Sequence, residues 1–504
     1  MYLEGDWGQG PSHHPDGGRR APRRRRRTVA PLFDPAAFWL LCALVVWAPI
    51  PLGSNRPWAW SILEIGLFAA GLLWLAACAR RENIVTPAAR AAWPALALLA
   101  LWLVYLLVQW LPMPAGWVRL VSPQAAALHA SANYLGDPER FVTLSIDPHA
   151  THVFWLKSCA YAVAFALTLL LVHGRRRLAW LCGAIVLSGA LQAFAGSLLH
   201  LARVDADILG MPMQWAAQAS GSFVNRNHLA GFLEMSLAVG IGLMIGRLED
   251  RPRRGWRQFL HDAAVLLLSR KAMLRLVLVL MVIALVMTRS RMGNTAFFAS
   301  LLVTGLLALL LSRRAPRSTV VFIASLVIVD LLLIGTWFGV EKTIQRIEQT
   351  TVRDVQERED PSVYALKIIE DYKATGTGAG TFYTAFPRYR GHDIGAFFDH
   401  AHNDYVQFLA ETGVIGIALM GLFSLSALAC AVLALARRRD PLLRGVAFGA
   451  VMGIVALGIH STVDFNLQIP ANAFIFMVLL ALAWLSLYLG KSGSETEKSG
   501  SEPK

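Results

Sequence analysis

Long apolar runs recur along the whole chain and are separated by short polar segments rich in arginine. The runs measure roughly 17–25 residues, the length at which an α-helix spans a bilayer. The alternating segments of about ten residues that build a membrane β-barrel do not occur. The pattern predicts an all-α fold, a polytopic membrane helical bundle of about 12 transmembrane helices. They are expected near residues 36–53, 58–79, 93–111, 152–172, 178–199, 228–246, 273–288, 294–312, 319–338, 413–436, 443–462 and 471–489.

The composition is that of a membrane protein. Of the 504 residues, 56% are hydrophobic and 16% are charged, and the mean hydropathy is +0.49. The formal net charge is +14, but most arginines lie in short loops between apolar runs. This distribution is typical of cytoplasmic loops, so we expect membrane lipids and no nucleic acid among the partners.

The basic clusters alternate onto one side of the predicted bundle. Because lysine and arginine favour cytoplasmic loops, that side and both termini are expected to be cytoplasmic, in a bacterial inner membrane. Residues 1–35 and 490–504 are predicted to be disordered cytoplasmic tails, the first of them basic. The clusters between helices lie at residues 80–81, 175–177, 247–257 with 270–271, 313–314 and 437–439.

This orientation leaves the longest polar segment on the outer, periplasmic side. Residues 36–338 then hold transmembrane helices 1–9, residues 339–412 form a large helical outer loop, and residues 413–489 hold helices 10–12. Within the loop, mixed charges at helical spacing predict a surface helix over Glu341–Glu359. We interpret that helix as a solvated face without chemistry of its own.

Two histidines end the outer loop, at the start of the tenth predicted helix. His400 and His402 are one residue apart, and Asp404 and Gln407 have the spacing of a helix-capping pair. His402 would then lie just ahead of a helix N-terminus, where the positive end of the dipole disfavours imidazolium. A neutral imidazole is what a general base needs to deprotonate an alcohol. The alternative is a structural or interfacial histidine.

The residues around His402 have a recognisable spacing. His402 and Asn403 are followed, after nine residues, by Gly413-Val414-Ile415-Gly416. This stretch resembles the H-[N/S/Q]-x9-G-x-x-[G/T/Y] signature of the O-antigen ligase and Wzy polymerase superfamily. The resemblance selects His402 rather than His400 as the catalytic histidine.

Three further stretches are similar to the same superfamily. Residues 221–231 (GSFVNRNHLAG) resemble its G-[T/S]-F-x-N-x-N-H-x-A-G segment. Residues 290–293 resemble its S-R-G-G turn, with Met292 in place of the first glycine, and residues 376–382 resemble its G-x-G-x-G-x-F segment. The resemblance extends over roughly residues 215–470.

The resemblance implies an inverting, metal-independent membrane glycosyltransferase of the lipid-carrier type, without a cofactor. Its donor is a glycan on undecaprenyl pyrophosphate, and its acceptor is a hydroxyl on the periplasmic side. That hydroxyl belongs to an acceptor glycan, to lipid A-core or to a protein. An O-antigen ligase, a polysaccharide polymerase and a protein O-oligosaccharyltransferase therefore remain open.

Arginines near the outer face are candidates to neutralise a pyrophosphate. Arg289 and the motif residue Arg291 flank a turn between two predicted spans, and Arg226 lies beside another span. Arginine binds phosphate oxygens bidentately and keeps its charge in a poor dielectric. Arg388 and Arg390 form a further basic pair ahead of His402 and are candidates to bind phosphate or sugar. The alternatives are snorkelling to lipid head groups and a solvated loop.

Other polar residues at the outer edge are assigned less sharply. Asn227 and His228, and with them Asn225, either hold the outer turn or contact the donor. His400 and Asn403 are expected to contact the substrate. His460 and Asp464 lie four residues apart, so they can pair on one helix face, which favours a structural role. No CxxC or HExxH occurs, and we predict no metal site.

A polysaccharide or lipid-linked glycan transporter is the alternative from another class. Twelve spans with both ends inside are common among transporters. A transporter is expected to carry charged or broken helices at the bilayer midplane. In this sequence the polar residues gather at the outer edge of the spans, which favours the transferase.

Overall fold

The computed structural model describes residues 32–80, 85–132, 140–208, 211–213, 215, 217–247, 270–311, 361–391 and 398–490. Within these ranges, nine helices are long and apolar enough to cross a membrane, which confirms an all-α polytopic membrane fold. They are α2 (Pro57–Ala79), α4 (Trp93–Trp110), α7 (Pro148–Leu171), α8 (Arg175–Leu201), α9 (Arg226–Ile245), α12 (Arg291–Leu311), α18 (Asp404–Arg437), α19 (Pro441–His460) and α20 (Pro470–Tyr488).

Two further apolar helices, α1 (Phe33–Trp47) and α11 (Arg270–Met287), coincide with predicted spans. The first ends before the predicted residue 53 because Pro49 and Pro51 follow it, and proline cannot continue a helix. The predicted span 319–338 and the predicted surface helix Glu341–Glu359 lie outside the described residues, as do most of both tails.

The remaining described elements are short. They are α3 (Pro87–Ala91), α5 (Ala115–Val121), α6 (Pro123–Ala132), α16 (Pro361–Asp371), α17 (Phe382–Ala385), the 3-10 helices η1 (Leu52–Ser54), η2 (Phe386–Arg388) and η3 (Asn466–Gln468), and the strands β1 (Met113–Pro114), β2 (Phe141–Val142), β3 (Ala206–Ile208) and β4 (Met211–Met213). The strands form two antiparallel pairs, with Met113 opposite Val142 and Asp207 opposite Pro212.

Several helices begin with a capping side chain followed directly by proline. The side chains of Thr86, Asp147 and Asp440 accept hydrogen bonds from backbone N–H groups in the first turns of α3, α7 and α19. Proline fits the first helical position because its missing N–H has no partner there. These local signals set where the helices begin.

The centre of the bundle consists of α9, α19 and α20. Their most apolar windows are 94%, 72% and 89% buried, whereas that of α2 is 22% buried. Glycine allows α9 and α19 to approach closely, because a Cβ at Gly242 would come within 2.2 Å of the Gly445 carbonyl oxygen. Small residues at such crossings are typical of membrane helices.

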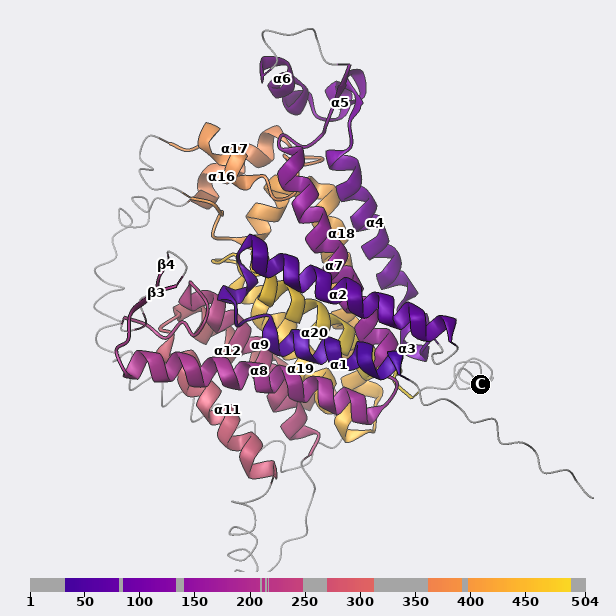
Figure 1. Ribbon diagram of the computed structural model, residues 1–504, viewed down its shortest axis with the longest axis vertical. Helices are drawn as coiled ribbons and strands as arrows, with labels where there is room; N and C mark the ends of the chain where they lie inside the picture. The colour runs from indigo at the N-terminus through magenta and orange to yellow at the C-terminus, as the bar shows by residue number, and fades with distance from the viewer. Residues whose placement is uncertain are drawn as a thin grey trace, which may run out of the picture.

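A cap covers one end of the bundle. We use this name for the described parts of residues 113–146 and 361–401. Its two halves share one apolar core, which includes Val118, Leu144, Ile368, Phe382 and Phe386. Figure 1 shows α5 and α6 projecting at this end, with α16 and α17 beside them. The cap therefore joins segments that are far apart in the sequence above the same helix ends.

Helix α18, which follows the last long loop, contains a break. This helix begins at Asp404, nine residues before the predicted span, and contains non-helical backbone at Gly413 (φ 60°, ψ −171°). A Cβ at Gly413 would lie 2.3 Å from the Ala374 carbonyl oxygen. The broken turn separates a short cap-facing helix from the membrane span.

Candidate active site

The start of α18 is held by Asn403. Its side chain accepts a hydrogen bond from the Val406 N–H (3.1 Å) and donates one to the Thr462 carbonyl (2.8 Å). The predicted Asp404–Gln407 capping pair is therefore wrong. An N-cap residue needs extended backbone, and Asn403 has it (φ −158°, ψ 109°). His402 still lies just ahead of a helix N-terminus.

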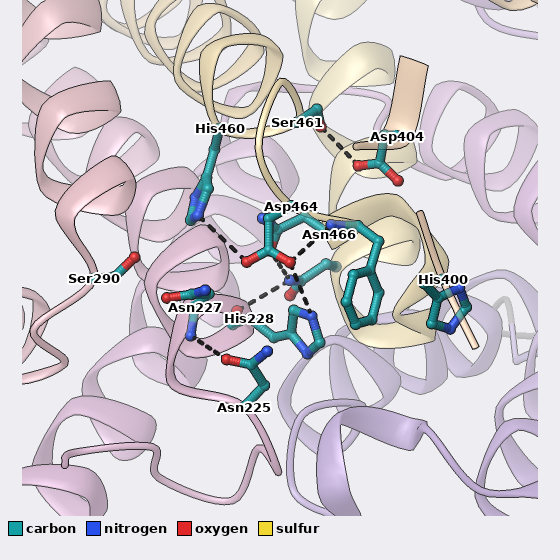
Figure 2. Close-up of polar contacts among 12 residues, drawn as sticks. Asn225, Asn227, His228, Ser290, His400, Asp404, His460, Ser461, Asp464 and Asn466 are labelled. Atoms are coloured by element: carbon teal, nitrogen blue, oxygen red, sulfur yellow. Dashed lines mark hydrogen bonds and ion pairs between the residues drawn. The ribbon is translucent and has the colours of Figure 1, made fainter. Parts of the chain in front are cut away.

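Asp404 instead joins α18 to the segment after α19. Its buried carboxylate accepts hydrogen bonds from the Ser461 hydroxyl (2.8 Å) and from the Leu467 N–H (3.1 Å). Figure 2 shows the contact between Ser461 and Asp404. Two chain segments that bear candidate residues are thereby fixed to each other.

His402 has an unusual backbone conformation. Its φ is 51°, in the left-handed region that residues with a Cβ seldom adopt. Its half-buried ring meets Phe398 edge to face at 5.9 Å and Phe465 at 4.8 Å. Such strain is kept when the surrounding structure determines the conformation, and it is common at functional sites.

Phe465 brings three histidines together. The His400 ring stacks on it at 4.3 Å, and His228 and His402 meet it edge to face at 4.6 and 4.8 Å. His228 comes from the first turn of α9, whereas His400 and His402 precede α18. Histidines from two motifs more than 170 residues apart in sequence thus surround one phenyl ring.

Behind Phe465 lies a buried network of ionisable side chains. Asp464 lies 3.6 Å from His228 Nε2 and 3.8 Å from His460 Nε2, and His460 Nδ1 lies 2.8 Å from Glu234 Oε1. Figure 2 shows His228 and His460 on either side of Asp464. Within the described residues, no group of three or more histidine, cysteine or acidic side chains is placed to hold a metal ion.

Two features of this network differ from the sequence-based interpretation. His460 and Asp464 do pair, but not on one helix face, because α19 ends at His460. Glu234, fully buried in α9, was not anticipated. A lone carboxylate in an apolar span is itself a signal, because membrane helices rarely keep one without a role.

Asp464 lies outside the membrane spans, between α19 and α20, and is a negatively charged member of this network. Burial would raise the pKa of its carboxyl group, but the neighbouring His228 and His460 imidazoles and the Phe465 N–H lower that pKa to about 2. A charged hydrogen-bond acceptor therefore faces His228 at neutral pH.

The turn between α11 and α12 lies beside this network. The Ser290 hydroxyl accepts a hydrogen bond from the Gly293 N–H (3.2 Å) at the start of α12. A Cβ at Gly293 would come within 2.6 Å of Ala230 and 3.1 Å of the Glu234 carboxylate. The glycine therefore lets the Ser290–Gly293 motif pack directly on α9, and Figure 2 shows Ser290 next to the network.

Asn225 caps α9, because its side chain accepts a hydrogen bond from the Asn227 N–H (2.8 Å). The amide of Asn472 donates to the His228 carbonyl (3.0 Å) and to the side-chain oxygen of Asn466 (2.9 Å). The sequence left open whether this turn's residues hold the turn or contact the donor. These contacts show that Asn225 holds the turn. Among the residues that the structure describes, no contact of this kind fixes the Asn227 side chain.

Three candidate arginines lie at this end of the helices. Arg289 and Arg291 are exposed and Arg226 is half-exposed, and Arg289 has a positive φ of 55°. Within the described residues, none of the three guanidinium groups forms a hydrogen bond or ion pair. They are therefore available to an anion, as their predicted role requires.

Glu411 anchors the glycine run of the cap. Its fully buried carboxylate accepts hydrogen bonds from the N–H groups of Gly380 (2.9 Å) and Phe382 (3.1 Å). Gly376 and Gly378 have φ of 69° and 109°, and a Cβ on either would come within 2.2 Å of a neighbouring atom. The run is thus a tight turn around a carboxylate, and its glycines permit the backbone conformations that this turn requires.

Arg388 and Arg390 lie in the cap and are exposed. Neither side chain contacts the histidines among the described contacts. Their segment is nevertheless near, because Phe386 meets Phe398 at 6.3 Å and Phe398 meets His402. Two aromatic side chains, Phe386 and Phe398, thus connect the segment of this pair with His402.

An apolar cavity runs into the bundle from the same region. It is lined by α4, α7, α18 and α20, and its lining includes Phe408 and Leu467, which flank Asp404 and Phe465 in sequence. Deeper lining residues are almost all hydrophobic, among them Trp102, Tyr161, Phe423 and Leu480. The cavity is therefore lined both by residues close in sequence to the histidine group and by apolar residues of the bundle.

The chain matches the family model described as O-antigen ligase over residues 276–421. This range contains the Ser290–Gly293 turn, the glycine run, His402 and Gly413. No curated protein matches the sequence. The family supports membrane glycosyltransferase activity of the ligase or polymerase type in general. Over residues 276–421 the chain is therefore similar to the O-antigen ligase family, which supports the superfamily that the sequence motifs resemble.

Proposed function

We propose that the protein transfers a glycan from undecaprenyl pyrophosphate to an acceptor hydroxyl on the periplasmic side of the inner membrane. The observation that carries the proposal is the position of His402. This histidine lies just ahead of α18 and meets Phe465. The apolar cavity is lined by Leu467, close to Phe465 in sequence, and the network next to Phe465 packs against the turn that carries Arg289 and Arg291. A lipid-linked pyrophosphate needs both an apolar and a cationic environment.

In this mechanism, His402 accepts the proton of the acceptor hydroxyl. The hydroxyl oxygen attacks the anomeric carbon, and the bond between that carbon and the pyrophosphate oxygen breaks with inversion. The electron pair leaves on undecaprenyl pyrophosphate. Arg291, helped by Arg289 or Arg226, stabilises that charge. Pyrophosphate is a good leaving group, so no proton has to be donated to it.

The lipid tail is assigned to the apolar cavity between α4, α7, α18 and α20. The cap, with Arg388 and Arg390, then lies above the reacting groups and is placed to select the acceptor. Ligase, polymerase and protein O-oligosaccharyltransferase activities share this chemistry and differ only in the molecule that bears the hydroxyl.

The test is transfer by purified protein in liposomes, with an undecaprenyl-pyrophosphate-linked glycan and each acceptor class in turn. His402→Ala is expected to lower kcat by about 10²–10⁴-fold. Arg291→Ala is expected to lower it by about 10²–10³-fold. His149→Ala and Arg90→Ala change exposed residues of the same types outside the cap and serve as controls. Normal turnover by both site variants, or transport of the glycan without transfer, would refute the proposal.

A further inference from the structure

His400 is held in one tautomer by a chain of hydrogen bonds. The Gln407 side-chain oxygen accepts a hydrogen bond from the Ala401 N–H (3.1 Å), which fixes the orientation of the amide. The amide nitrogen therefore points the other way and donates to His400 Nδ1 (3.0 Å) and to the Glu411 carboxylate (3.1 Å). Nδ1 lies 3.0 Å from this amide nitrogen and 3.3 Å from the amide oxygen. The shorter contact makes Nδ1 the acceptor, which puts the proton of the neutral ring on Nε2.

The orientation of the Gln407 amide is fixed by its contacts with Ala401 and Glu411. Glu411 accepts from two backbone N–H groups as well as from Gln407, so it acts only as an acceptor here. A flipped amide would place oxygen against the carboxylate and nitrogen against the Ala401 N–H, and both contacts would be repulsive. Gln407 and Glu411 are thus positioning residues for His400.

The ring of His400 is also fixed in direction. It stacks on Phe465 at 4.3 Å with an interplanar angle of 23°, and its side chain is only 22% exposed. Burial, opposed by the Asp399 charge and reinforced by His228 and His402, lowers the pKa of His400 to about 4. At neutral pH this residue is therefore an uncharged N–H donor rather than a base.

A carboxylate lies next to the free end of that donor. Asp399 Oδ2 is 3.9 Å from His400 Nε2, too far for a direct hydrogen bond. One oxygen atom can lie at about 2.8 Å from both atoms. A hydroxyl group fits this position, because it accepts from Nε2–H and donates to the carboxylate. A phosphate does not fit, because the Asp399 charge repels it.

We propose that His400 and Asp399 bind a single hydroxyl group of the transferred or accepting glycan, next to the reacting centre. The inference rests on the proposed function, and it moves His400 from the general set of substrate contacts to a sugar-hydroxyl site. It also adds Asp399 to the site, an exposed residue that no sequence motif singled out. Sugars carry many such hydroxyl groups, so a glycan is the class of substrate that fits this site.

Steady-state kinetics test the proposal with the donor and acceptor on which the wild-type protein acts. His400→Phe keeps stacking on Phe465 but removes the donor, and it should raise KM for one substrate by roughly five- to tenfold. Asp399→Ala should raise the same KM. The substrate whose KM rises identifies the glycan that bears the hydroxyl.

Two further variants separate hydroxyl binding from a structural effect. His400→Gln retains an N–H donor and should recover most of the affinity. Gln407→Leu has no donor for Nδ1, so the ring is no longer held with its proton on Nε2, and KM should rise although His400 is present. The double variant of His400→Phe and Asp399→Ala should have the same KM as the single variant with the higher KM, because both residues contact the same hydroxyl. His149→Gln is the matched surface control.

The outcomes are separable from those of the proposed function. Absence of transfer by the wild-type protein contradicts the proposed function. If the wild type transfers glycan but His400→Phe and Asp399→Ala leave both KM values unchanged, the hydroxyl site is wrong. Additive effects in the double variant would also overturn it, because independent contacts add.

Discussion

Replacing Glu411 tests whether this carboxylate holds the cap to the helices. In Glu411→Gln, one carboxylate oxygen becomes an NH₂ group. The remaining oxygen can keep the contacts with Phe382 and Gln407, and the Gly380 N–H then faces another donor. A buried N–H without an acceptor costs about 1–3 kcal/mol. Glu411→Ala removes the acceptor for all three donors, so its cost should be at least about 3 kcal/mol.

Thermal unfolding in detergent measures the effect. A thiol-reactive dye is suitable, because Cys42, Cys182 and Cys430 are buried and react only when helices separate. For about 500 cooperatively unfolding residues, 1 kcal/mol corresponds to roughly 1 °C in Tm, and to more if the cap opens locally. We expect Tm to fall in the order wild type, Glu411→Gln, Glu411→Ala.

The matched control is Glu370→Gln, the same substitution at an exposed position of α16. It should leave Tm unchanged, since exposed substitutions of this kind are usually within about 0.5 kcal/mol. Should Glu411→Ala unfold at the same temperature as Glu370→Gln, the glycine run would not depend on this carboxylate. The chain of contacts from Glu411 to His400 would then lose its basis.

Three further outcomes are expected. Gly413→Ala should greatly lower the yield of folded protein in size-exclusion chromatography, because φ at this position is 60° and the new Cβ would lie 2.3 Å from the Ala374 carbonyl oxygen. A normal yield would contradict the break in α18. The pKa of His400 falls from 6.5 to about 4 on folding, so the folded state loses stability as pH drops from about 6.5 towards 4, by about 2 kcal/mol at pH 5. His400→Phe should therefore lose less Tm than wild type between pH 7 and pH 5; an equal loss would refute the assignment. Ser424→Trp should fill the apolar cavity and raise KM for the lipid-linked donor several-fold while the acceptor KM stays constant.

The helices were predictable from sequence because the bilayer leaves few choices. Every backbone polar group in hydrocarbon needs an internal partner, so a long apolar run becomes a helix. The errors lie at helix ends, where side chains decide. Proline ended α1 before the apolar run did, and Asn403 rather than Asp404 supplied the cap of α18.

The site was predictable only as far as a motif reaches. The spacing around His402 identified that residue, and the asparagine-rich turn identified His228. The partners of these histidines come from other segments, so no local pattern announces them. Phe465 and Glu234 contribute through packing between α9 and the end of α19. Contacts of such sequence separation follow from the tertiary fold and not from spacing.

The nine residues between Asn403 and Gly413 nevertheless contain a pattern that has a structural reason. Asn403, Gln407 and Glu411 follow one another at intervals of four, so they lie on the same face of a short helix. The first caps that helix, the second orients His400, and the third holds the glycine run. One residue more or less would rotate Glu411 by about 100° from that face. The fixed distance between the histidine and the glycine is therefore the length of helix needed to connect the candidate base with the cap.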